Sequence, residues 1–154
     1  MEEITKLRNF LELTYSELEV KNLEAKEKHL DDPKKLQAEY TAYLEGEKRI
    51  KVVTICFTDI EGRFHMLDYD KNFLLASVDN LTFDGSSIRG FTAQHESDLR
   101  LTIDWGSIRW LPSDIFGPGK VIMFANISAR DKKQYESDFR GLLYEYTRNL
   151  KKKE

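Results

Sequence analysis

The sequence has little of several features that define whole classes of protein. Cys56 is the only cysteine among its 154 residues, so an intrachain disulfide is excluded. This thiol lies in a strand-like run, and we interpret it as a small core residue rather than a nucleophile. The three histidines, His29, His65 and His95, show no ligand spacing such as H-x-x-x-H, so no metal site is expected.

Long apolar runs are also missing. No segment approaches the roughly 20 apolar residues of a membrane span. Charged residues such as Glu2, Glu3 and Lys6 interrupt the start, where the apolar stretch of a signal peptide would lie. We therefore expect a soluble, cytoplasmic protein. Because the net charge is only −3, the composition gives no argument for nucleic acid or an anionic membrane as a partner.

The charged residues are distributed unevenly along the chain. Residues 1–50 carry 12 acidic and 9 basic side chains, whereas residues 51–154 carry 15 of each. The length allows one domain with additions at its ends. We predict a helical hairpin over 1–50, a sheet domain over 51–130, and a linker with a C-terminal helix over 131–154.

The first fifty residues have the periodicity of helices. One long helix is predicted from Met1 to about Leu30, with apolar residues every seven positions at Ile4, Leu11, Leu18 and Ala25. Asp32 is suited to cap a second helix, over 33–44, that starts at Pro33. Two interpretations of the apolar stripe stay open: it is an oligomerisation or docking surface, or it packs on itself and on the following domain.

The remainder is predicted to contain several strands and one helix. Strands are expected over 51–59, 63–69, 96–104, 107–111 and 120–127, the last in the centre of a sheet. Gly62 supplies the turn of a first hairpin, and Asp70 is a candidate cap for a short helix. A loop is expected over 112–119. The final helix begins at about Asp138 and has an apolar stripe made of Leu142, Leu143, Tyr146 and Leu150.

One loop between apolar, strand-forming segments stands out as a candidate binding site. It is Phe83-Asp84-Gly85-Ser86-Ser87-Ile88-Arg89-Gly90-Phe91. Its glycines and serines disfavour regular structure. Polar loops of this kind, held by rigid strands, are where binding residues are most often found.

Three motifs in collinear order resemble glutamine synthetase. The loop 83–91, followed by Glu96-Ser97-Asp98-Leu99, resembles that family's serine–glycine loop and the strand after it. Phe57-Thr58-Asp59-Ile60-Glu61-Gly62 is similar to the first hairpin of its N-terminal β-grasp domain. Tyr135-Glu136-Ser137-Asp138-Phe139-Arg140-Gly141 resembles the start of its catalytic domain. The resemblance implies an α+β fold, with a β-grasp-like mixed sheet preceded by the helical hairpin and followed by the C-terminal helix.

The resemblance also implies roles for three residues of the loop. In the family this loop reaches the active site of a neighbouring subunit, where an aspartate and a serine help form the ammonium site and an aromatic residue covers it. The matching residues are Asp84, Ser87 and Phe91, although many members have tryptophan at the last position. A carboxylate favours ammonium and can accept its proton. The alternative is that Asp84 and Ser86 merely close a tight turn.

The family's catalytic domain supplies its ATP, divalent-metal and glutamate sites, and the match to this chain stops before them. The resemblance therefore implies no cofactor in this chain and no activity of the chain alone. One hypothesis is a non-catalytic module for nitrogen assimilation that docks on a glutamine synthetase subunit or catalytic fragment and offers the Asp84 loop in trans. Another is a fragment or relic of the enzyme that only self-associates as an oligomer. In a third, the hairpin is the functional part and the sheet is its scaffold.

Overall fold

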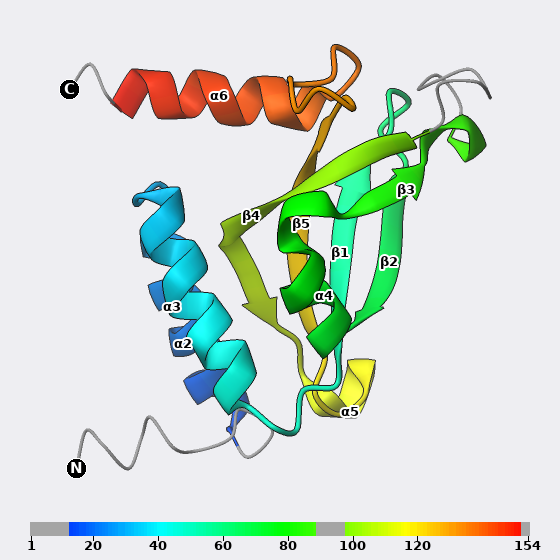
Figure 1. Ribbon diagram of the computed structural model, residues 1–154. Helices are drawn as coiled ribbons and strands as arrows, with labels where there is room; N and C mark the ends of the chain where they lie inside the picture. Colours follow the sequence, from blue (N-terminus) through cyan, green and yellow to red (C-terminus); the bar gives the residue numbers. More distant parts are fainter. Residues whose placement is uncertain (1–12, 89–97, 152–154) are drawn as a thin grey trace.

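The computed structural model describes residues 13–88 and 98–151 (Figure 1). The strands are β1 (Val52–Thr58), β2 (Phe64–Asp70), β3 (Thr82–Asp84), β4 (Asp98–Trp110) and β5 (Val121–Ser128). The helices are α2 (Tyr15–Glu27), α3 (Pro33–Gly46), α4 (Lys71–Ser77), α5 (Ser113–Phe116) and α6 (Phe139–Lys151), with single 3₁₀ turns η2 (Val78–Asn80) and η3 (Gly85–Ser87).

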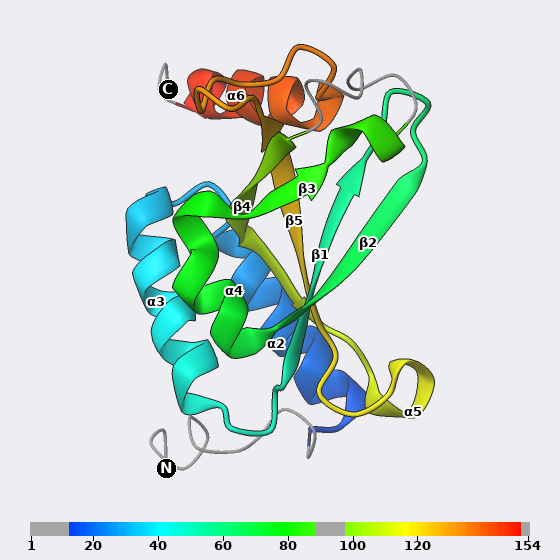
Figure 2. The ribbon, with the colours of Figure 1, turned by 45° about the vertical axis from the view of Figure 1, so that its right-hand side comes forward.

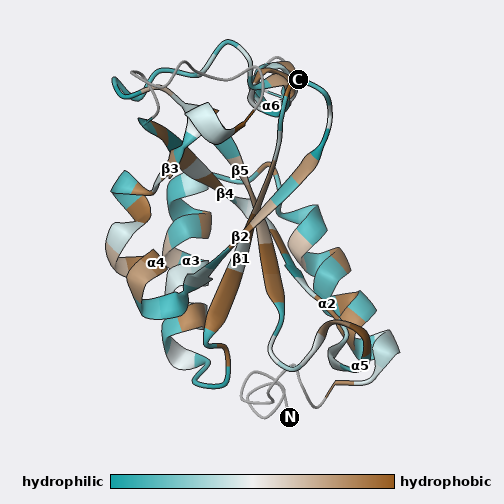
Figure 3. Ribbon diagram, turned by 90° about the vertical axis from the view of Figure 1, so that its right-hand side faces the viewer, coloured by the Kyte–Doolittle hydropathy of each residue, from teal (hydrophilic) through white to brown (hydrophobic). Residues whose placement is uncertain are grey.

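The strands form one mixed sheet in the order β2-β1-β5-β4-β3. The pair β1 and β5 is parallel, and the other three pairs are antiparallel. Apolar residues follow the central strands (Figure 3). The predicted α+β fold with a β-grasp-like sheet is confirmed, and β5 is its central strand as expected. None of the helices in the described ranges is long and apolar enough to cross a bilayer.

The local sequence correctly predicted the turn of the β1–β2 hairpin and the start of the helix α4. Gly62 has a φ of 76°, which glycine adopts at little cost. One oxygen of Asp59 accepts the N–H groups of Glu61 and Arg63, each at 2.9 Å. Asp70 caps α4 by accepting the N–H of Phe73 at 3.0 Å. The predictions of the turn and of the cap are confirmed.

The two strands predicted on either side of residue 105 are wrong as separate elements, because β4 is continuous from Asp98 to Trp110. The register to β5 shifts between Asp104 and Arg109. Ser107 stabilises the shift: its hydroxyl accepts the N–H of Phe124 at 2.7 Å and donates to the carbonyl of Asp104 at 2.5 Å. Such a bulge keeps one strand continuous while breaking its alternation, which explains the misleading pattern.

The predicted helix over residues 1–30 is wrong at Thr14, where the backbone is extended with a ψ of 165°. The N–H of Glu17 donates to the Thr14 hydroxyl at 3.3 Å, and the Glu17 carboxylate accepts the N–H of Thr14 at 2.8 Å. This capping box starts α2 at Tyr15. The part of the prediction that falls on residues 1–12 lies outside the described residues.

The helix α3 begins as predicted, because Asp32 accepts the N–H groups of Lys34 and Lys35. Both α2 and α3 pack against β4 (Figure 2). Their inward residues belong to the same core as the sheet and are Leu18, Ala25, Leu36, Tyr40 and Leu44. For the described part of the stripe, Leu18 and Ala25, the interpretation in which it packs on the following domain is confirmed, while Ile4 and Leu11 lie outside the described residues. The division into domains at residue 50 stays a prediction.

The outer edge of β4 is covered by a side chain. β3 pairs only with residues 98–100 of β4, so within residues 13–88 and 98–151 the far part of that edge has no strand beside it. There Asn22 acts in place of a strand: its amide donates to the Trp110 carbonyl at 2.9 Å and accepts the Trp110 N–H at 3.0 Å. The Trp110 indole donates to the Tyr43 hydroxyl at 2.9 Å. These bonds attach α2 and α3 to the sheet.

Candidate functional site

The loop singled out in the sequence begins as a tight turn at the end of β3. One oxygen of the Asp84 carboxylate accepts the Ser86 N–H at 3.0 Å and the Ser86 hydroxyl at 2.6 Å. The other oxygen accepts the Ser87 hydroxyl at 2.8 Å. The sheet fixes the position of the turn, because Asp84 pairs with Asp98 and Phe83 pairs with Leu99 of β4.

The Asp84 carboxylate is exposed and anionic. Hydrogen bonds from the side chains of Ser86 and Ser87 hold its pKa below the usual range, because they favour the ionised form. The structure thus brings together Asp84 and Ser87, while Phe91 lies outside the described residues. The turn-closing interpretation is correct as a description of the geometry. It does not exclude a ligand, since a carboxylate offers about four lone-pair sites.

Asp98 and Arg130 also lie next to this turn, and the sequence did not identify them as a charged pair. Asp98, which faces Asp84 across the strand pair, forms an ion pair of 2.9 Å with Arg130. The carbonyl of Arg130 in turn accepts the guanidinium of Arg100 at 2.6 Å. Like charges opposite each other on neighbouring strands repel, and Arg130 offsets this repulsion. Its distance of 32 residues from Asp98 in the sequence leaves no local signal.

The helix α6 lies across the same end of the sheet as the β1–β2 turn and the Asp84 turn (Figure 1, Figure 2). Its start is anchored by Asp138, whose buried carboxylate accepts the N–H of Ile127 at 2.6 Å. Burial raises the pKa of this carboxyl. Arg140 forms an ion pair of 2.5 Å with Asp104 and also bonds to Asn126. The first turn of α6 is therefore fixed firmly to β4 and β5.

The opposite face of α6 is apolar and uncovered in the described structure. Its large side chains are 48–65% exposed, and they are Phe139, Leu142, Leu143, Tyr146 and Leu150. We call these five residues the α6 face. Four of them form the stripe predicted from the sequence. Contiguous exposed apolar side chains on a folded protein mark surfaces that bind other proteins.

A match to a model of a known protein family accompanies this geometry. Residues 49–129 match the family described as "Glutamine synthetase, beta-Grasp domain". The glutamine synthetase of Thermotoga maritima is 31% identical over 109 residues, which cover 70% of this chain and 24% of the relative. That of Thermus thermophilus is 32% identical over 120 residues, which cover 75% of this chain and 27% of the relative. The chain thus spans about a quarter of the length of these curated relatives.

A solved structure agrees with the fold. The glutamine synthetase of Plasmodium falciparum superimposes with a TM-score of 0.66 at 19% identity, over 76% of this chain and 23% of that one. Such a likeness supports the architecture of the sheet and its helices and not a particular activity. Because the family model covers more than half of the 154 residues, this chain belongs to the glutamine synthetase β-grasp domain family.

Proposed function

We propose that this chain is a non-catalytic module that docks on a glutamine synthetase subunit, or on a separate catalytic fragment, and offers the Asp84 turn in trans. In this proposal ATP, divalent metal and glutamate bind to the partner. The chain's own contribution is the carboxylate of Asp84 with the hydroxyl of Ser87, which attract an ammonium ion and accept hydrogen bonds from it.

The observation that carries this proposal is the position of the α6 face. Five large apolar side chains are exposed on a helix at the end of the sheet that also carries the Asp84 turn. A protein that covered this helix would lie near the anionic turn. The proposal thus joins the apolar surface, which supplies binding energy, with the polar turn, which supplies chemistry.

The first experiment is the native mass of the full chain, tagged and purified gently from its own cells. We expect a complex that contains a glutamine synthetase subunit. Leu143→Asp places a charge on the α6 face and should abolish this complex. Asn149→Asp, which adds the same charge beside that face, serves as the matched control and should leave the complex intact.

A second variant separates docking from the role of the turn. Asp84→Asn should leave the complex intact. At low ammonium concentration, however, the complex with this variant should form glutamine more slowly than the complex with the wild-type chain. If the wild-type chain is instead a monomer or a homo-oligomer without a synthetase subunit, the docking role is wrong. If Asp84→Asn changes nothing in an intact complex, docking stands and the role of the turn fails.

A further inference from the structure

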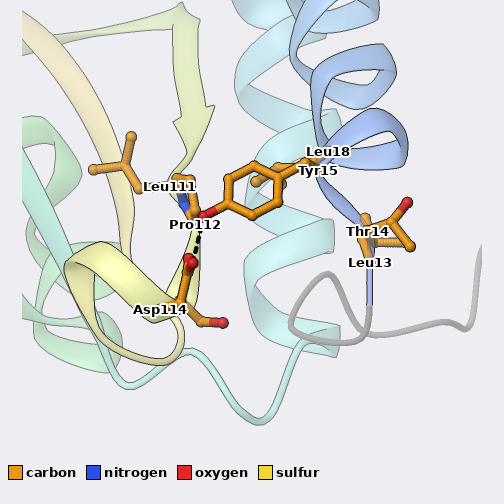
Figure 4. Close-up of a pocket in the computed structure, with 8 residues that line it drawn as sticks. Leu13, Thr14, Tyr15, Leu18, Leu111, Pro112 and Asp114 are labelled. Carbon is orange, nitrogen blue, oxygen red and sulfur yellow. Dashed lines mark hydrogen bonds between the residues drawn. The ribbon is translucent and has the colours of Figure 1, made fainter.

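A polar pocket of about 270 Å³ lies between the end of α3, the loop after it and the start of α4. We call it the lysine pocket, and its lining consists of Glu45, Lys48, Lys51, Asp70, Lys71 and Asn72. It differs from the pocket of about 150 Å³ at the start of α2, which is lined mainly by apolar residues and in which the Tyr15 hydroxyl is bonded to the Asp114 carboxylate (Figure 4). In the lysine pocket, most of the lining is charged.

Lys71 brings a buried positive charge to this pocket. The residue is 7% exposed, and its ammonium donates a hydrogen bond of 2.8 Å to the carbonyl of Glu47. Among the residues that the structure describes, it forms no ion pair. An ammonium has three donors, so it can make further bonds. Because buried charges in proteins are normally paired, this one is suited to receive an anion.

Lys51 lies opposite Lys71 at the ends of β1 and β2. The Lys71 N–H donates to the Lys51 carbonyl at 2.8 Å, which continues the strand pairing one step beyond Val52 and Asp70. Like charges opposite each other on neighbouring strands are destabilising. Burial lowers the pKa of the Lys71 ammonium, and the charge of Lys51 lowers it further. An anion between the two lysines would relieve this repulsion.

The carboxylates that attract Lys71 are already engaged elsewhere. They belong to Glu47 and Asp70. The Glu47 carboxylate accepts a backbone N–H of its own loop at 3.1 Å, and the Asp70 carboxylate accepts one at 3.0 Å as the cap of α4. Glu45, the other acidic residue of the lining, is exposed. The described carboxylates around the pocket therefore leave the Lys71 ammonium without a direct counterion.

We propose that the lysine pocket binds a phosphate group through Lys48, Lys51 and Lys71. Ammonium groups bind the tetrahedral oxygens of phosphate as point charges, whereas a planar carboxylate is matched best by the guanidinium fork of arginine. None of the lining residues in the described part of the chain is an arginine. The volume lies just below the range of about 300–1,000 Å³ for drug-sized ligands, so it suits a small anion. This inference does not depend on the proposed docking role.

Titration calorimetry of the full chain with inorganic phosphate, at an ionic strength held constant with chloride, tests the site. Lys51→Gln should weaken the binding roughly tenfold or more, because it removes a charged donor. Lys34→Gln removes the same charge from an exposed position in the first turn of α3 and is the matched control, which should bind as the wild type does. Glu45→Gln should strengthen the binding, because it removes a charge that repels the anion.

Two further measurements identify the ligand and its location. Glycerol phosphate, used in place of inorganic phosphate, distinguishes the phosphate group of a larger molecule from the free ion, according to which of the two binds more tightly. The backbone amide shifts that phosphate causes in NMR spectra should fall on residues 45–51 and 70–72, and the same spectra show whether each variant is folded. Absence of binding at millimolar phosphate, equal weakening by Lys34→Gln and Lys51→Gln, or shifts confined to other residues would overturn the proposal.

Discussion

Asp59 and Asp84 both close tight turns, and they differ in their exposure to solvent. Asp59 is 4% exposed, and its carboxylate lies 2.8 Å from His65 Nε2. The hydrogen bond from His65 is the main cause of its lowered pKa, and the N–H groups of Arg63 and Glu61 add to the effect. Asp84 makes similar bonds on the surface. Asp59 is therefore a structural carboxylate, whereas Asp84 is accessible to a ligand.

Substitution of Asp59 should change how folding stability depends on pH. The folded pKa of Asp59 lies below that of an unfolded aspartate, about 3.9. Its contribution is therefore fully present above that pH and is lost as the pH falls through the folded pKa. Asp59→Asn should be less stable than the wild type at pH 7. The difference should shrink in acid, as measured by urea unfolding at a series of pH values.

Asp79→Asn removes one negative charge from an exposed position on η2 and serves as the control for this series. If Asp59→Asn and the wild type lose stability in parallel below about pH 4, near the unfolded aspartate pKa, Asp59 is not the group responsible. A constant difference would then point to packing rather than to ionisation.

Residues that act on near neighbours in sequence could be predicted, and those that act over a distance could not. Asp32, Gly62 and Asp70 work within four residues of themselves, so turn and capping rules place them. Asn22 bonds to a residue 88 positions away, and Arg140 to one 36 positions away. Neither residue type signals such a partner, because the contact exists only after the sheet has formed.

At the scale of elements, the attachment of α2 to β4 solves the problem of an uncovered strand edge. Unpaired backbone groups at such an edge invite pairing with other chains. Asn22 satisfies both the N–H and the carbonyl of Trp110 with one side chain. Sequence rules do not predict this contact, since asparagine in a helix usually points to solvent or marks an end.

Asn22→Leu should therefore destabilise the fold although it keeps a side chain of similar size. It leaves two half-buried backbone groups of Trp110 unpaired, which costs about 1–3 kcal/mol of the free energy of unfolding. Urea unfolding followed by tryptophan fluorescence measures this cost. Glu27→Ala, at an exposed position on the same helix, should change stability by less than about 0.5 kcal/mol. Equal effects of the two substitutions would show that the bonds to Trp110 add nothing.

The β4 strand is an element whose extent the sequence pattern does not predict. Alternation predicts strands on both sides of Trp105, and both exist, but the bulge between Asp104 and Arg109 joins them into one. The position of Gly106 has a tertiary cause. A Cβ atom at position 106 would lie 2.6 Å from the carbonyl oxygen of His29. The close approach of the turn between α2 and α3 to β4 therefore requires glycine at this position of the strand. Turn propensity alone suggests a break in the strand at that point.

At the scale of the whole molecule, the N-terminal helices and the sheet share one core. Leu36 and Leu44 of α3 are 2% and 0% exposed, and they lie in the same buried cluster as Ile55 and Met123 of the sheet. A helical pair with so few inward residues buries too little apolar surface to be stable alone. We therefore expect residues 13–151 to unfold as one unit, although the sequence suggested a boundary at residue 50.

Leu44→Ala tests whether the N-terminal helices and the sheet unfold as one cooperative unit. The substitution removes a fully buried side chain from α3 and should lower the free energy of unfolding by about 2–5 kcal/mol. If the core is shared, circular dichroism at the helix band and tryptophan fluorescence should report the same lowered midpoint, because two-state unfolding makes all probes coincide. Val20→Ala, at a position that is 55% exposed on α2, is the control and should leave both midpoints nearly unchanged. Loss of the helical signal at low denaturant, with the fluorescence transition of the wild type preserved, would instead establish residues 1–50 as a separate domain.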